Sequence, residues 1–104
     1  MTEHDLQNRI RIELSALGFM TKRTNVGKVK MHDGRFFDSG LPKGHSDLEV
    51  HGSNGDTYFI EVKVKPNKPT SEQLNFLKVM ESRGFKTGVA YSVEDALAIC
   101  GGAV

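Results

Sequence analysis

The sequence predicts an α/β sandwich, in which helices cover both faces of a small mixed sheet. Three observations lead to this prediction. Apolar residues recur at helical spacing near the amino terminus, two β-rich runs flank an Asn-Gly turn, and helical and strand patterns alternate through the last third of the chain. Because each such element must bury its apolar side against a neighbour, this order predicts a layered domain.

Length and composition are those of an ordinary globular protein, and we expect residues 1–104 to form one domain with a modest core. A net charge of +1 does not by itself indicate a nucleic-acid binder. The single cysteine, Cys100, excludes an intramolecular disulfide and a cysteine-based zinc site. With no signal peptide and no apolar run of membrane-spanning length, we expect a cytoplasmic protein.

The first helix is predicted to begin at a capping box formed by Thr2 and Asp5 and to end at Gly18. Glu3 projects from the apolar side of this helix. It is either a first-turn acid that suits the helix dipole or a third carboxylate directed at a metal site. Glu13 lies at the flank and is expected to be exposed. The helical spacing is set by Leu6, Ile10, Leu14 and Leu17.

A strand is predicted over residues 19–24, and the region 25–44 is the least regular part of the chain. Residues 29–31 and 35–37 could pair around an Asp-Gly turn. The region is rich in glycine and basic residues, so it is either a contact to a phosphate backbone or a solvated loop. His32 and His45 are possible ligands or bases, although lone loop histidines are usually neither. The candidate basic contacts are Lys28, Lys30, Arg35 and Lys43, with Lys65 further along.

The central hairpin is predicted from a strand at 48–50, a turn over 51–56 and a second strand at 57–64. Side chains alternate along a strand, so Glu61 and Lys63 share one face, and the hairpin can bring Asp47 beside Glu61.

Two carboxylates and an ammonium at the end of an apolar hairpin need a chemical explanation. Buried charges are usually paired or bound to a metal, and Mg²⁺ is often held by one or two carboxylates with water and phosphate oxygens. The lysine would then stabilise an attacking hydroxide or the charge that develops on phosphorus. The alternative is a solvated strand face with a salt bridge.

A second helix is predicted after Thr70, which forms another capping box with Gln73. Gln73 either caps its own helix only or also reaches a metal-bound water or a substrate phosphate. A strand over 85–91 and a short helix from Ser92 to Ile99 complete the predicted elements.

This ordered set of residues resembles the PD-(D/E)xK nucleases, and in particular a stand-alone virus-type replication-repair nuclease (VRR-NUC) domain. The resemblance spans nearly the whole chain and implies a restriction-endonuclease-like fold, with the element order α-β-β-β-α-β-α. The matching pieces are Glu3 with Gln7, the segment 40–47 (GLPKGHSD), the segment 59–63 (FIEVK), the segment 71–73 (SEQ) and the segment 92–97 (SVEDAL).

The resemblance also implies phosphodiester hydrolysis that depends on Mg²⁺ or Mn²⁺. It assigns Asp47, Glu61 and the carbonyl of Val62 as metal ligands, and Lys63 as the residue that orients or activates water. Glu3 becomes an auxiliary acid, and Gln73 a contact to a ligand or phosphate.

Small members of this group are similar to Holliday junction resolvases that act as homodimers, and the family name implies a phage context. We therefore expect an endonuclease that selects DNA by structure, with four-way junctions as the leading substrate. The alternatives are a flap, nick or duplex nuclease without junction preference and a catalytically idle DNA-binding dimer. Ile12, which faces away from the apolar side of the first helix, is a hint of a second interface.

Overall fold

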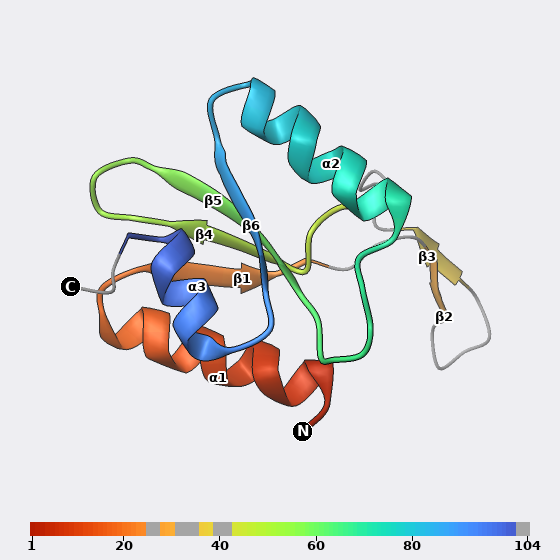
Figure 1. Ribbon diagram of the computed structural model, residues 1–104, viewed down its shortest axis with the longest axis horizontal. Coiled ribbons are helices and arrows are strands. Elements are labelled where there is room, and N and C mark those ends of the chain that lie inside the picture. Colours follow the sequence, from red (N-terminus) through yellow and green to blue (C-terminus); the bar gives the residue numbers. More distant parts are fainter. Residues whose placement is uncertain (25–27, 31–35, 39–42, 102–104) are drawn as a thin grey trace.

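The described part of the chain forms a four-stranded sheet with helices on both faces, and a separate two-stranded ribbon (Figure 1). This computed structural model describes residues 1–24, 28–30, 36–38 and 43–101. In chain order the elements are α1 (Glu3–Ala16), β1 (Met20–Arg23), β2 (Lys28–Lys30), β3 (Phe36–Asp38), β4 (Leu48–His51), β5 (Thr57–Val62), α2 (Ser71–Ser82), β6 (Lys86–Ala90) and α3 (Val93–Ile99).

The main sheet has the strand order β1-β4-β5-β6. Strand β4 pairs antiparallel with both β1 and β5, whereas β6 pairs parallel with β5. A parallel pair needs a crossover connection, and α2 supplies it. The predicted mixed sheet between helices is therefore confirmed.

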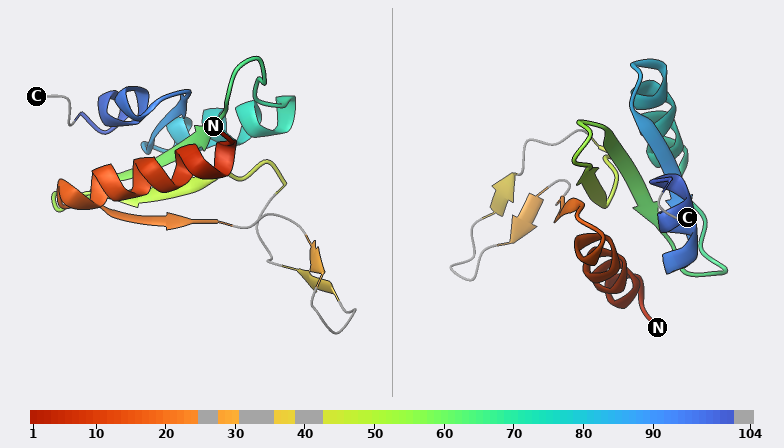
Figure 2. Two further views of the ribbon diagram at one scale, coloured as in Figure 1. Left: turned by 90° about the horizontal axis from the view of Figure 1, so that it is seen from below. Right: turned by 90° about the vertical axis from the view of Figure 1, so that its left-hand side faces the viewer.

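Strand β5 is the centre of the fold because its residues are buried on both faces. Ile60 and Val62 belong to the core that includes Leu6 and Ile10 of α1 and Ala96 of α3. Side chains alternate along the strand, so its other residues face the opposite side, where α2 lies. Figures 1 and 2 show α1 and α3 together on one side of the sheet and α2 apart from them.

The helices begin at the capping residues that the sequence predicts. The hydroxyl of Thr2 accepts a hydrogen bond from the main-chain N–H of Asp5, and the Asp5 carboxylate accepts one from Thr2 in return. Helix α3 begins after Ser92, whose hydroxyl accepts from the N–H of Asp95. These bonds satisfy donors that a helix start leaves unpaired.

The ribbon formed by β2 and β3 adds two strands to the predicted element order. Lys28 pairs with Asp38 and Lys30 with Phe36, and neither strand joins the main sheet. The sequence allows a hairpin here within one residue of these bounds, and the Asp33-Gly34 turn proposed for it lies outside the described residues. Among the described helices, none has both the length and the apolar character needed to cross a membrane.

Candidate active site

The two candidate metal ligands lie across from each other at the open end of the β4–β5 hairpin. Leu48 pairs with Ile60, so one further step of this register places Asp47 opposite Glu61. The main-chain N–H of Val62 donates a hydrogen bond of 3.0 Å to Oδ2 of Asp47, which holds this carboxylate against β5. The structure thus brings together the two acids, as the alternation of side chains along the strands predicts.

The carboxylate of Glu61 is buried, and only one of its two oxygens has a hydrogen-bond partner among the described residues. Its side chain is only 1% exposed. Oε1 accepts a hydrogen bond of 3.3 Å from Nε2 of Gln73, whereas Oε2 is buried without a hydrogen-bond partner among the described residues. A buried carboxylate oxygen without a partner is costly, so this position favours a proton or a cation.

Burial is the main reason why the pKa of Glu61 rises to about 9, and the neighbouring Asp47 carboxylate raises it further. The charge of Lys63 opposes this rise, and that of Glu3 adds to it. Without a cation, the folded protein therefore holds Glu61 in its protonated form at neutral pH.

Gln73 caps its own helix and also contacts Glu61, while its contact with a metal-bound water or a phosphate stays a prediction. Its Oε1 accepts a hydrogen bond of 2.8 Å from the N–H of Thr70, and the Thr70 hydroxyl accepts one of 3.2 Å from the N–H of Gln73. The other end of the same amide donates to Glu61. The residue that completes the helix cap is thus also the one that holds the buried acid.

Glu3 and Lys63 surround this pair from two further elements. Glu3 opens α1, is half-buried and accepts a hydrogen bond of 3.1 Å from Nδ2 of Asn67 in the loop after β5. Lys63 directly follows β5, and its main-chain N–H donates to the carbonyl of Ala90 at 3.0 Å. Both side chains are close enough for their charges to act on Glu61, as its pKa shows.

The glycine before the site allows the approach loop to touch the start of α2. Gly44 has a φ of +86°, which favours glycine, and a Cβ at this position would lie 2.5 Å from the carbonyl oxygen of Glu72. Lys43, a candidate DNA contact, is exposed and forms an ion pair of 3.4 Å with Glu72. The loop that leads to Asp47 is therefore packed directly on the helix that carries Gln73.

His45 is part of an aromatic cluster. Its ring is buried, with its centre 4.4 Å from that of Phe76 and 5.9 Å from that of Phe59. Nδ1 lies 2.9 Å from the carbonyl oxygen of Ser46. These contacts give His45 a packing role, as is usual for a lone histidine, while His32 lies outside the described residues.

The remaining basic candidates are only partly described. Arg35 lies outside the described residues, and for Lys28 and Lys30 only the main chain is described, as strand β2. Lys65 is exposed, and its Nζ lies 5.9 Å from the centre of the Tyr91 ring, next to the loop that contacts Glu3.

A cavity of about 260 Å³ opens beside Asp47. It reveals a residue that the sequence analysis missed, Arg23 at the end of β1. Arg23 pairs with Leu48, and the next N–H, of Thr24, donates to the carbonyl of Asp47 at 2.9 Å. Only the pairing of β1 with β4 could have indicated this arrangement. The lining residues are Gln7, Arg23, Thr24, Gly44, His45, Asp47 and Gln73.

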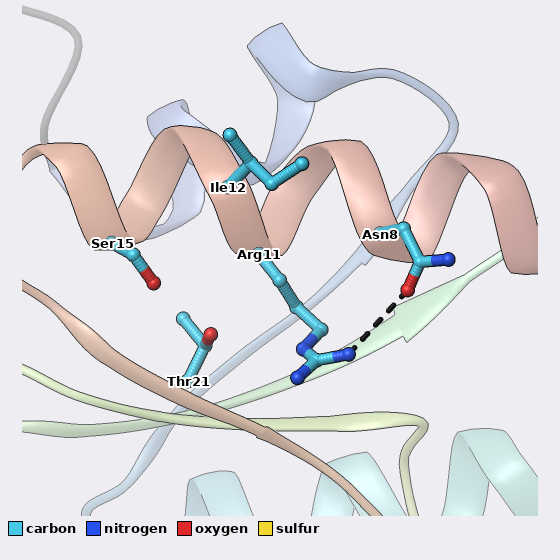
Figure 3. Close-up of a pocket in the computed structure, with 5 residues that line it drawn as sticks. All are labelled: Asn8, Arg11, Ile12, Ser15 and Thr21. Carbon is cyan, nitrogen blue, oxygen red and sulfur yellow. Dashed lines mark hydrogen bonds between the residues drawn. The ribbon is translucent and has the colours of Figure 1, made fainter.

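A larger cavity, of about 570 Å³, lies between α1 and β1 (Figure 3). It contains none of the acids described above. We place the candidate active site at the smaller cavity because Asp47 and Gln73, the two neighbours of the buried Glu61, line it.

The residues present fit a hard divalent cation. Asp47 and Glu61 supply two adjacent carboxylates, and the buried Oε2 of Glu61 is available to a positive charge. Among the described residues, no three acidic, histidine or cysteine side chains converge as a closed ligand set.

The mixed four-stranded sheet between helices agrees with the restriction-endonuclease-like fold that the resemblance implies. A solved structure described as a VRR_NUC domain has the same fold, with a TM-score of 0.71, 23% sequence identity and complete coverage of both chains. No protein-family model and no curated protein matches the sequence. The resemblance predicted from the motifs is therefore confirmed in the fold.

Proposed function

We propose that this protein is a metal-dependent endonuclease of the PD-(D/E)xK type that hydrolyses phosphodiester bonds in DNA. One observation carries the proposal: Asp47 and Glu61 are held opposite each other in a VRR_NUC-like fold, and Glu61 keeps a buried oxygen without a partner. Such an arrangement is costly for a purely structural role and suited to a cation.

In this proposal Asp47, Glu61 and the main-chain carbonyl of Val62 hold Mg²⁺ or Mn²⁺. The bound ion supplies Lewis-acid neutralisation of the charge on the scissile phosphate. Gln73 orients Glu61 through the hydrogen bond described above.

Lys63 orients the attacking water and stabilises the negative charge that develops during the reaction. The water oxygen bonds to phosphorus as the bond from phosphorus to the 3′ oxygen breaks, which leaves a 5′ phosphate and a 3′ hydroxyl. Glu3 acts as an auxiliary acid beside this site, held by Asn67.

For the substrate we propose branched DNA, with four-way junctions preferred, and a homodimer as the acting form. Two symmetric nicks require two active sites, which a two-fold dimer supplies. The exposed Ile12, at 68% exposure, is the residue that we connect with a second interface. A phage-encoded protein that acts in the bacterial cytoplasm would fit this activity.

A cleavage assay tests these proposals. An immobile four-way junction, a flap, a nicked duplex and a linear duplex of the same sequences are incubated with Mg²⁺ or Mn²⁺, and Asp47→Ala serves as the control for contaminating nucleases. Paired symmetric cuts in the junction alone would support the dimeric resolvase. Equal cleavage of all substrates would retain the nuclease and reject the junction preference. No cleavage of any substrate by the folded protein would favour a DNA-binding dimer without activity.

A further inference from the structure

The cavity between α1 and β1 presents the polar groups of one arginine, one asparagine, one serine and one threonine (Figure 3). Arg11 and Ser15 point from the helix toward the strand, and Thr21 points back from β1. The lining residues are Asn8, Arg11, Ile12, Ser15 and Thr21.

Arg11 is the residue of this cavity best suited to bind an anion. Its Nη1 donates a long hydrogen bond of 3.4 Å to Oδ1 of Asn8, and the side chain is half-buried. Its Nε–H is buried and has no acceptor among the described residues. A guanidinium that is partly removed from water needs an acceptor, and two oxygens of a phosphate can accept from two of its N–H donors at once. The hydroxyls of Ser15 and Thr21 are further donors on the same cavity.

This cavity continues the one that contains Asp47. Gln7 lies one helical turn before Arg11, about 6 Å along the axis. On β1, Arg23 lies two residues after Thr21, about 7 Å along the strand and on the same face. The two cavities are therefore lined by the same two elements in succession. Both spacings are comparable with the separation of neighbouring phosphates along one nucleic-acid strand.

We infer that the α1–β1 cavity binds a backbone phosphate of the DNA strand, outside the position that is hydrolysed. Arg11 is the principal contact, and Arg23 connects this subsite with the catalytic acids. The inference rests on the proposed nuclease function and extends it, because it predicts the direction in which the substrate leaves the active site: along α1 and β1, away from Asp47.

The lining favours nucleic acid over a second protein copy. Ile12 borders the cavity but points away from β1 (Figure 3), so the interface that we connect with it lies beside the cavity and not in it. The other four lining residues offer a guanidinium, an amide and two hydroxyls. Phosphate contacts in DNA complexes come largely from such groups. A subunit interface at this cavity would instead need a carboxylate from the partner to reach Arg11.

The first experiment measures DNA binding without cleavage in an Asp47→Ala background, using a linear duplex and a four-way junction at several salt concentrations. Adding Arg11→Gln should weaken binding about tenfold and reduce the slope of log affinity against log salt by about one. Arg9→Gln is the matched control, because Arg9 is an exposed arginine on the same helix that lines a different cavity. It should leave both quantities unchanged.

A second measurement does not depend on the stability of a variant. In the protein labelled with ¹⁵N, the Nε–H resonance of Arg11 should shift as a short DNA duplex is added, and that of Arg9 should not. Unchanged affinity, salt slope and resonance, with wild-type cleavage intact, would overturn the phosphate subsite and leave the nuclease proposal standing. Absence of wild-type cleavage would overturn the nuclease instead, whatever Arg11 binds.

The oligomeric state supplies the remaining outcome. If Arg11→Gln converts a dimer to a monomer in sedimentation, and DNA has no effect on the Arg11 resonance, then the cavity is a subunit interface and the proposal is wrong.

Discussion

Replacing Glu61 with glutamine should change the pH dependence of stability in the metal-free protein. The folded pKa of Glu61, about 9, lies above its ordinary value of 4.5. The folded state therefore binds this proton more tightly than the unfolded state does. The resulting stabilisation is complete below pH 4.5 and is lost as the pH rises through about 9. Glutamine carries no titrating proton and removes this dependence.

The magnitude follows from the two pKa values. Between about pH 5 and about pH 8, proton linkage at one such group reduces the free energy of unfolding by about 4 kcal/mol. The wild type should therefore lose about 4 kcal/mol more unfolding free energy than Glu61→Gln as the pH rises over this interval. Using the difference cancels the other titrating groups that the two proteins share.

Urea unfolding in the presence of a chelator measures this difference. The chain contains no tryptophan, so circular dichroism is the suitable signal. Saturating Mg²⁺ should restore most of the stability that the wild type loses at the higher pH, because the cation replaces the proton. It should have little effect on the stability of Glu61→Gln. A difference between the two proteins that stays constant from about pH 5 to about pH 8 would refute the assignment of a buried, protonated Glu61.

Three further predictions concern the site and its support. Calorimetry of Mn²⁺ binding near neutral pH, in two buffers of different ionisation enthalpy, should show about one proton released for each ion bound. Asp47→Ala should abolish binding. Binding without proton release would contradict a protonated Glu61. Lys63→Ala should abolish cleavage and leave metal and DNA affinity nearly unchanged, because the lysine acts on water; full activity in this variant would falsify the mechanism. Gly44→Ala should destabilise the protein by about 3 kcal/mol, from left-handed backbone strain and the contact with Glu72. Gly55→Ala is the matched control, because φ there is +88° and a Cβ would have no neighbour within 4 Å. Its free energy of unfolding in urea should fall by only about 1 kcal/mol. Equal falls in the two variants would remove the packing argument.

The features that the sequence predicts correctly depend on short-range rules. The capping pair of Thr70 and Gln73 spans a single helical turn, and the positions of Asp47 and Glu61 follow from alternation along two strands joined by a short turn. Such patterns are local, so the sequence contains nearly all the information that determines them.

The features that the sequence analysis missed depend on contacts between distant segments. Arg23 reaches the site only because β1 pairs with β4, and no local pattern determines the neighbour of an edge strand. For the same reason, the sequence left open whether Gln73 served its helix or the site. The insertion of His45 among Phe59 and Phe76 also requires the packing of α2 on the sheet.

The double role of Gln73 sets a lower limit on the smallest chain that can form this site. A fragment that ended after β5 would contain every acid of the motif, yet it would lack the amide that orients Glu61. Since Gln73 occupies its position only when the first turn of α2 is wound, fraying of that turn would release the acid at the same moment. Amide exchange at the start of α2 should therefore report how often the contact between Gln73 and Glu61 opens in the resting protein.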